Sequence, residues 1–299
     1  MLTILEINGL DKSYGPVHAV KDLHLKVDKG QVFGILGPNG SGKTTTLAMI
    51  LGIVRMNAGE FSWFEEAPKP GSRQKIGALI ESPNFYPYLN LERNLRIICD
   101  IKNIPMTEVS RVLQVAGLYE RRKSRFQTLS YGMKQRLALA SVMLGDPEVL
   151  VLDEPANGLD PQGIAEVREI IREEAKKGKT IIMASHILDE VEKVCTHVAV
   201  LRLGTLLASG EVGQLMKVEE TIFLSADNME TLGNLLDNYP GTEKVSGGQI
   251  HFELVLKDGF SSGDLNKSLM DQGISLNKME IHKQSLEEQF LELLKQADN

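Results

Sequence analysis

Two short stretches near the start of the chain alternate apolar and polar residues. Residues 2–7 are rich in β-forming residues and end at the turn pair Asn8-Gly9, and residues 20–27 alternate and end at residues 28–30. A period of two places the apolar side chains on one face of a sheet, as in antiparallel sheets with one solvated face. We therefore expect both stretches to be strands of an antiparallel sheet.

Three further stretches are apolar almost throughout, which is typical of strands buried on both faces. They are residues 31–36, 148–152 and 180–184. Between the last two, a helix is predicted over 161–177, because Asp160 can cap it, Pro161 suits its first position and Gly178 can end it. A strand, a helix and a strand in succession form a βαβ unit, whose strands are parallel. The core is therefore predicted to be a parallel sheet.

The remaining patterns divide the chain into regions. Residues 90–145 are mostly helical in pattern, which predicts an inserted helical subdomain within a first domain of residues 1–215. Residues 216–299 form a second, small α+β domain. Its predicted elements are strand 221–226, helix 228–238, a hairpin 243–256 turning at Gly247-Gly248, helix 264–271, strand 276–283 and helix 286–296. The β-α-β-β-α-β order is that of a ferredoxin-like arrangement.

Composition limits the classes of protein that the chain can belong to. The 299 residues include 33 Lys and Arg and 40 Asp and Glu, a net charge of −7. This acidic balance argues against a protein that coats nucleic acid or a lipid surface. No apolar stretch approaches the ~20 residues of a membrane-spanning helix, and no secretory signal is visible at residues 1–10. The two distant cysteines, Cys99 and Cys195, indicate a reducing compartment.

The charge is unevenly distributed along the chain. Residues 215–299 carry 15 acidic and 7 basic residues, a net charge of −8, which leaves +1 for residues 1–214. The acidity therefore belongs to the C-terminal domain, and the first domain is nearly neutral.

Residues 37–44 match the P-loop pattern G-x-x-x-x-G-K-[ST]. Its glycines let the backbone curl so that successive N–H groups bind phosphate oxygens, and the helix predicted over 45–53 directs its positive end at them. In this pattern Lys43 reaches the β- and γ-phosphates and the Thr44 hydroxyl ligates Mg²⁺. A Gly-rich turn without a ligand is disfavoured by the buried strand before it and the helix after it. The predicted ATP-binding residues are Gly37, Pro38, Asn39, Gly40, Ser41, Gly42, Lys43, Thr44 and Thr45.

Two acidic residues, Asp153 and Glu154, follow the second buried strand. A carboxylate at the end of a strand beside a P-loop strand can hold Mg²⁺ through its water shell. Glu154 is then placed to polarise the water that attacks the γ-phosphate. A merely polar strand end is the alternative, which the nearby P-loop disfavours.

Five motifs in a fixed order now indicate a family. The P-loop is followed by Leu-Ser-Tyr-Gly at 129–132 with Gln135-Arg136, Asp-Glu-Pro at 153–155, Gly-Leu-Asp at 158–160 and Ala-Ser-His at 184–186. Over residues 1 to about 215 this order resembles the nucleotide-binding domain of ABC transporters. The resemblance implies a P-loop α/β fold with an antiparallel β subdomain, a parallel-sheet core and an inserted helical subdomain. It also implies an ATPase that uses ATP and Mg²⁺, with Lys43, Glu154 and His186 as catalytic residues.

The resemblance assigns roles to further residues. In the family, the signature Ser and Gly contact the γ-phosphate of ATP held by the other subunit, and here these are Ser130 and Gly132. Tyr14 takes the position of an aromatic residue that stacks on adenine, and Asp160 that of a loop crossing to the partner subunit. His186 takes the position of a histidine that contacts the γ-phosphate. Ordinary structural roles, a half-buried strand aromatic and a core histidine, are the alternatives for Tyr14 and His186.

Two departures from the family pattern point to one branch. Glu81 stands where most members have a glutamine that ligates Mg²⁺ and leads into the helical subdomain. A carboxylate there still binds Mg²⁺ but adds negative charge near the phosphates. The signature also reads Ser-Tyr-Gly-Met over residues 130–133, without the usual second glycine and glutamine. Both traits resemble the ABC-2-type exporters, and within them the ATPases of bacitracin and lantibiotic self-protection systems.

The expected partners follow from the resemblance. One P-loop and one signature per chain imply that two chains pair head to tail around two ATP molecules. The work is then delivered to a separate polytopic permease, docked in a groove near residues 81–130, at the cytoplasmic face of the plasma membrane. No nucleic-acid partner is expected, because the basic run at 121–125 lacks an aromatic stacking platform.

The function predicted is therefore the ATP-hydrolysing subunit of an exporter for an antibiotic-like peptide or drug. A transporter for lipid or ion cargo is one alternative. A soluble ABC ATPase acting on ribosomes or DNA is another, although the second cassette or long coiled coil usual in such proteins is missing. A non-catalytic nucleotide sensor is disfavoured by the complete set of motif residues.

Overall fold

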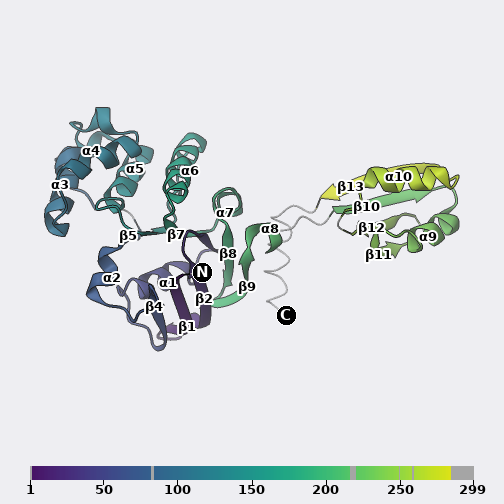
Figure 1. Ribbon diagram of the computed structural model, residues 1–299, viewed down its shortest axis with the longest axis horizontal. Helices are drawn as coiled ribbons and strands as arrows, with labels where there is room; N and C mark the ends of the chain where they lie inside the picture. Colours follow the sequence, from purple (N-terminus) through teal and green to yellow (C-terminus); the bar gives the residue numbers. More distant parts are fainter. Residues whose placement is uncertain (1, 82–83, 216–219, 249, 258, 284–299) are drawn as a thin grey trace. The chain divides into compact units, whose positions relative to one another are not determined.

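The computed structural model describes residues 2–81, 84–215, 220–248, 250–257 and 259–283. The chain divides into two compact units, Met1–Leu215 and Met216–Asn299, which are described separately (Figure 1). The helix predicted over 286–296 lies outside the described residues. In the part of the chain that the structure describes, no helix has the length and apolar character to cross a bilayer.

The first unit begins with a three-stranded antiparallel sheet in the order β2-β1-β4. Its strands are β1 (Thr3–Tyr14), β2 (Val17–Asp28) and β4 (Ala58–Trp63). The antiparallel pairing of the first two is confirmed, but the predicted end at Asn8-Gly9 is wrong. β1 continues through this pair with shifts in its register to β2 between Ile7 and Leu10. Gly9 adopts a φ of 63°, so the strand bends at a bulge and does not end.

The core sheet of the first unit has six strands in the order β5-β6-β7-β3-β8-β9, parallel except for the last pair. They are β3 (Val32–Leu36), β5 (Ile76–Leu79), β6 (Val149–Asp153), β7 (Thr180–Ser185), β8 (His197–Arg202) and β9 (Thr205–Glu211). Every residue of β3, β6 and β7 is buried, which confirms the prediction of strands buried on both faces. Since these three strands are neighbours and parallel, the loops after their carboxyl ends meet at one edge of the sheet.

Helices cover the core sheet and form a separate group beyond it (Figure 1). The bounds are α1 (Lys43–Ile50), α2 (Pro70–Gln74), α6 (Pro161–Lys176), α7 (Leu188–Val194) and α8 (Val212–Leu215). The separate group comprises α3 (Leu91–Lys102), α4 (Thr107–Val115) and α5 (Tyr131–Val142), with short 3-10 turns at Tyr119–Arg121 and Phe126–Thr128. All of residues 90–145 are described and none lies in a strand of a sheet. Helix α6 joins β6 to β7, as the βαβ prediction requires.

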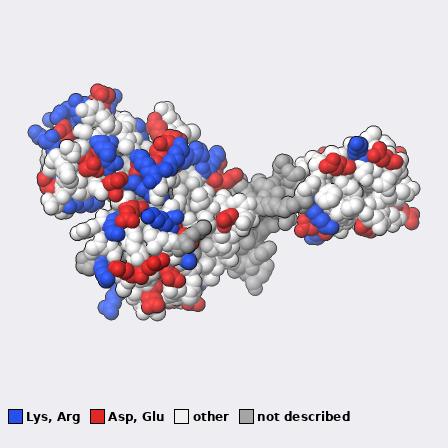
Figure 2. Space-filling model, viewed as in Figure 1, with Lys and Arg blue, Asp and Glu red and all other residues white. Residues whose placement is uncertain are grey.

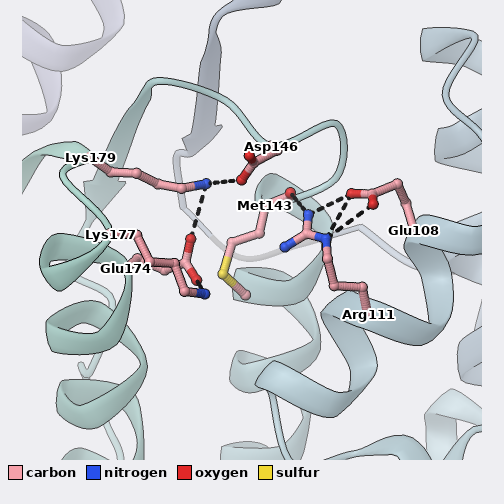
Figure 3. A network of polar contacts seen from close by, with 7 residues as sticks. All are labelled: Glu108, Arg111, Met143, Asp146, Glu174, Lys177 and Lys179. Carbon is pink, nitrogen blue, oxygen red and sulfur yellow. Dashed lines mark hydrogen bonds and ion pairs between the residues drawn. The ribbon is translucent and has the colours of Figure 1, made fainter.

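A network of charged groups lies where α5 leads back to the core sheet (Figure 3). Arg111 of α4 donates a hydrogen bond of 2.9 Å to the carbonyl of Met143, at the end of α5. Lys179 lies 2.6 Å from Asp146 and 3.0 Å from the fully buried carboxylate of Glu174 in α6. The connection from α5 to β6 is therefore held by a cation from the helical group at one end and by a cation from the core at the other.

The second unit is a four-stranded antiparallel sheet in the order β11-β12-β10-β13. Its elements are β10 (Glu220–Ala226), α9 (Met229–Asp237), β11 (Thr242–Gly247), β12 (Phe252–Leu256), α10 (Ser262–Asp271) and β13 (Leu276–Lys283). The predicted β-α-β-β-α-β order is confirmed and the arrangement is ferredoxin-like. Ile222, Leu224 and Leu254 belong to an apolar core that lies wholly within this unit.

Lys and Arg side chains lie beside Asp and Glu side chains over much of the visible surface of the first unit (Figure 2). In the basic run at 121–125, Lys123 lies 2.5 Å from Glu92, and Arg122 lies over the ring of Tyr119 at 4.4 Å. These contacts within the helical group favour an ordinary surface role for the run.

Candidate functional site

The P-loop leaves the carboxyl end of β3 in a conformation that its glycines make possible. Gly40 and Gly42 have φ values of 82° and 102°, where residues with a side chain are strained. A Cβ on Gly42 would lie 2.4 Å from the carbonyl oxygen of Ala19, and one on Gly37 would lie 2.3 Å from that of Leu201. The close packing of this loop against β2 and β8 therefore excludes any side chain at these two positions.

Lys43 is the first residue of α1 and is buried. Its Nζ donates hydrogen bonds to the carbonyls of Gly37 at 2.8 Å and Pro38 at 3.2 Å, so the side chain folds back over the loop. The helix begins two residues before the predicted start and ends three residues before the predicted end. Its N-cap is Gly42, which has no side chain with which to mark the boundary in the sequence.

A cleft of about 580 Å³ lies over the P-loop. The predicted residues that line it are Tyr14, Asn39, Gly40, Gly42, Lys43, Thr44, Thr45 and Glu154. The rest of the lining comes from residues that no sequence motif indicates, which are Pro16, Val17, His18, Ala19, Lys21 and Leu203. The hairpin of β1 and β2 brings most of these residues here, because Tyr14 pairs with Val17 across the turn. Leu203, in the turn between β8 and β9, had no local pattern that could have identified it.

Tyr14 presents its ring at the rim of this cleft. The residue is 47% exposed, and the Nζ of Lys12 lies 4.8 Å from the ring centroid. A flat ring with an open face can stack on a nucleobase. Tyr14 ends β1 with its ring at the cleft over the P-loop, so stacking on a base stays a prediction that this position favours.

Asp153 ends β6 beside the P-loop and is 5% exposed. Its Oδ1 is buried and has no hydrogen-bond partner in the part of the chain that the structure describes. Burial raises the pKa of Asp153, the charges of Glu154 and Glu81 raise it further, and a hydrogen bond with Thr44 opposes them. A cation at this position would favour the ionised carboxylate and occupy the free oxygen.

The oxygen-donor set at this position fits Mg²⁺, which prefers carboxylate and hydroxyl oxygens together with water. Glu81 follows β5 with a φ of 58°, and residues 82–83 after it lie outside the described residues. Among residues 2–81, 84–215 and the described parts of the second unit, no three His, Cys, Asp or Glu side chains form a metal cage. A magnesium ion held here by Thr44, Asp153 and Glu81 would therefore need phosphate oxygens and water as further ligands.

Glu154 lies between two side chains that can bind its carboxylate. Its Oε2 is 2.7 Å from the Nδ1 of His186, and its Oε1 is 3.4 Å from the Nζ of Lys43. The residue has a φ of 48°, and its N–H donates to the carbonyl of Ala184 in β7. The ends of three neighbouring strands therefore bring Lys43, Glu154 and His186 together, although they are far apart in the sequence.

The signature residues line a different cleft of about 450 Å³. Ser130 caps α5 by accepting a hydrogen bond from the N–H of Met133 at 3.3 Å, and Asp160 caps α6 by accepting one from Gly163 at 2.8 Å. Gly132 also lines this cleft, which shares no lining residue with the cleft over the P-loop. Tyr131, which the sequence analysis did not identify, lines it and is 52% exposed. Within one chain, the structure does not bring the two groups of predicted ATP-binding residues together.

Comparisons with known proteins bear on this site. A family profile described as ABC transporter matches residues 20–157, which contain the P-loop, the signature and the Asp153-Glu154 pair. The chain is 35% identical over 309 residues to the bacitracin transport ATP-binding protein BcrA of Bacillus licheniformis, covering 98% of each protein. It is 33% identical over 249 residues to the Nod factor export ATP-binding protein I of Cupriavidus pinatubonensis, covering 81% of this chain and 75% of that protein.

Solved structures give the same fold. The cbiO1 protein of Clostridium perfringens, described as part of the ABC transporter complex cbiONQ, superimposes with a TM-score of 0.66 at 26% identity. The superposition covers 80% of this chain and 97% of that one.

Proposed function

The chain belongs to the ABC transporter family and is an ATP-binding subunit with ATPase activity. We propose that it powers export of an antibiotic-like peptide or drug through a separate permease. The position of Glu154 between His186 and Lys43 is the observation that supports ATP hydrolysis by these residues. The similarity to a bacitracin transport protein over nearly the whole of both chains supports the cargo.

The proposed catalytic residues act on the γ-phosphate of ATP. The curled backbone of residues 37–44 binds the phosphates, and Lys43 exchanges the carbonyls of Gly37 and Pro38 for phosphate oxygens. Thr44, Asp153 and Glu81 would hold Mg²⁺, which would supply positive charge for the phosphate oxygens. Glu154 accepts a hydrogen bond from the attacking water and then its proton. The water oxygen forms a bond to the γ-phosphorus as the bond from that phosphorus to the bridging oxygen breaks, which gives ADP and phosphate.

Two copies of the chain are proposed to share the nucleotides. One cleft offers the P-loop and the other offers Ser130, Gly132 and Asp160, and no lining residue is common to both. A head-to-tail pair with two-fold symmetry would place each signature cleft over the P-loop cleft of the partner. The γ-phosphate would then favour the closed pair, and its loss on hydrolysis would favour opening.

The permease is proposed to dock in a groove near residues 81–130, which would hold the subunit at the cytoplasmic face of the membrane. Glu81 supports this location. It follows β5, which pairs with β6, and it begins the connection to the helical group. Similarity to one bacitracin transport protein and one Nod factor export protein supports export in general more strongly than it supports any one cargo.

The catalytic assignment is tested by Glu154→Gln. We expect turnover to be lost while ATP binding persists, so that an ATP-bound dimer accumulates; ATPase assays and light scattering measure the two effects. Glu148→Gln is the matched control, since Glu148 precedes the same strand and pairs with the exposed Lys75. Normal hydrolysis by Glu154→Gln, or a monomer at saturating ATP, would overturn the assignment.

The export assignment is tested by co-purification from the native membrane and by cargo-stimulated ATPase activity. We expect a polytopic membrane protein, encoded beside this chain, to co-purify, and a peptide antibiotic such as bacitracin to stimulate hydrolysis in the reconstituted complex. Absence of any polytopic partner would reject the exporter. Stimulation by a lipid or an ion in place of the peptide would reject the proposed cargo but keep the transporter.

A further inference from the structure

A buried carboxylate, that of Glu190, follows His186 by four residues. Glu190, in the first turn of α7, is 4% exposed. Its Oε2 accepts a hydrogen bond of 2.8 Å from the hydroxyl of Ser185, and its Oε1 is buried without a partner among the described residues. An acidic side chain is rarely buried in this way unless it serves a local purpose, because an unpaired oxygen of a buried carboxylate destabilises the fold.

Ser185 connects this carboxylate to both sides of the proposed catalytic site. Its hydroxyl accepts a hydrogen bond of 3.0 Å from the N–H of Ile187, so the side chain closes a tight turn around His186. Its carbonyl accepts a hydrogen bond of 3.3 Å from the N–H of Gly37, the first residue of the P-loop. Two acceptors face the hydroxyl hydrogen of Ser185, the Oε2 of Glu190 at 2.8 Å and the carbonyl of Ile187 at 3.5 Å. The shorter distance favours Glu190 as the acceptor.

The position of the His186 ring affects its contact with Glu154. The Nδ1 of His186 lies 2.7 Å from the Oε2 of Glu154. The backbone turn at residues 185–187 sets the direction in which the His186 side chain leaves the main chain. We propose that Glu190 is a positioning residue for ATP hydrolysis, which fixes the turn carrying His186 through the hydroxyl of Ser185. The inference rests on the proposed roles of Glu154 and His186.

An ordinary ion pair does not account for Glu190. The nearby cation, Arg168, lies 3.3 Å from Asp189, the residue before Glu190, and no ion pair joins it to Glu190 among the described contacts. Burial raises the pKa of Glu190, and the hydrogen bond from Ser185 opposes this rise. The hydroxyl of Ser185 is therefore the specific partner of this side chain.

The first experiment compares Glu190→Ala, Glu190→Gln and Ser185→Ala, with Glu192→Ala as the matched control on the exposed side of the same helix. We expect kcat to fall about tenfold in Glu190→Ala and Ser185→Ala, since a misplacement of about 1 Å can cost about a hundredfold and we expect a smaller displacement here. The affinity for a non-hydrolysable ATP analogue should change less than twofold, because the P-loop itself is untouched. Glu190→Gln should recover most of kcat, because an amide oxygen can accept from Ser185, and Glu192→Ala should match the wild type.

The second experiment combines Glu190→Ala with His186→Ala. If Glu190 acts through His186, the double variant loses no more kcat than His186→Ala alone. A multiplied loss, or a normal kcat in Glu190→Ala, would overturn the inference. If Glu190→Ala does not fold, Ser185→Ala is combined with His186→Ala instead, and the kcat of that double variant is compared with that of His186→Ala in the same way. If the wild-type chain hydrolysed no ATP, the proposed function itself would be contradicted. Failure of the proposed function is thus distinguished from failure of the inference about Glu190.

Discussion

At the residue scale, Tyr14 offers a test of the nucleotide-base contact. We expect Tyr14→Ala to weaken ATP binding by about 1–3 kcal/mol, the usual contribution of a base stacked on an aromatic ring, and Tyr14→Phe to retain most of the affinity. Titration with a fluorescent ATP analogue measures both. Tyr88→Ala is the control, because this exposed tyrosine lies outside the cleft over the P-loop. Equal affinity in Tyr14→Ala and the wild type would show that the ring does not stack.

Some residues that line the cleft over the P-loop have no signal in the sequence. Tyr14 and Lys43 belong to recognisable motifs, whereas His18 and Leu203 reach the same cleft only through strand pairing and a distant turn. Ser185 lies within a motif, but its bond to Glu190 requires the turn between β7 and α7. A sequence motif therefore indicates residues that contact a ligand more readily than residues that position those residues.

At the scale of single elements, Asp160 is the N-cap of α6. We expect Asp160→Ala to lower the free energy of unfolding by about 1 kcal/mol, because the N–H of Gly163 loses its acceptor. Asp160→Asn should restore the stability, since an amide oxygen also caps. Chemical denaturation of the first unit measures both. If both variants were equally unstable, the carboxylate charge and not the cap would account for the loss.

The network in Figure 3 predicts a pH-dependent contribution to stability. Burial raises the pKa of Glu174, but contacts with Lys177 and Lys179 outweigh it, so the net pKa lies below its usual value. A hydrogen bond from Lys179 likewise lowers the pKa of Asp146. Carboxylates with a lowered pKa stabilise the fold above the unfolded value of about 4, and this contribution is lost as the pH falls through the folded value.

Lys179→Met tests this network. We expect the free energy of unfolding to fall by about 2–3 kcal/mol at pH 7, less than for an isolated buried pair because Lys177 still contacts Glu174 at 2.5 Å. The difference from the wild type should shrink below about pH 4, where the carboxylates become protonated. Denaturant titrations across this range measure it. Lys176→Met, which removes an exposed pair with Glu173, should have no measurable effect; a loss that did not vary with pH would contradict the ionic origin.

At the scale of the whole molecule, the two units have separate apolar cores, so we expect two unfolding transitions. ATP with Mg²⁺ should raise only the transition of Met1–Leu215. A ligand at 100 times its Kd stabilises by about 2.7 kcal/mol, which corresponds to roughly 5–10 °C for a unit of this size. Scanning calorimetry of the full chain measures both transitions.

The control for this experiment is Lys43→Ala, which should show two transitions and no shift with ATP. A single cooperative transition, or an equal shift of both, would contradict independent units. The charge distribution agrees with a division of labour, because the nearly neutral part holds the ATP motifs and residues 215–299 carry the acidic excess.

The sequence by itself determined the fold class, the βαβ core and most of the residues of the candidate site. It could do so because the P-loop, the Asp-Glu pair and the signature are local patterns, and because buried strands and capped helices leave their own periodicity. The sequence could not determine that β1 runs on through Asn8-Gly9, since a glycine marks a bulge as readily as a turn.

Only the tertiary structure decided which of these residues meet. The order of β6, β7 and β3 brings Glu154, His186 and Lys43 to one edge, while Ser130 and Asp160 line another cleft. It also placed the carboxylate of Glu190 against the hydroxyl of Ser185, the residue before His186. The physical reason is that contacts between distant segments depend on strand order and on the packing of helices against the sheet, which no local pattern of side chains specifies.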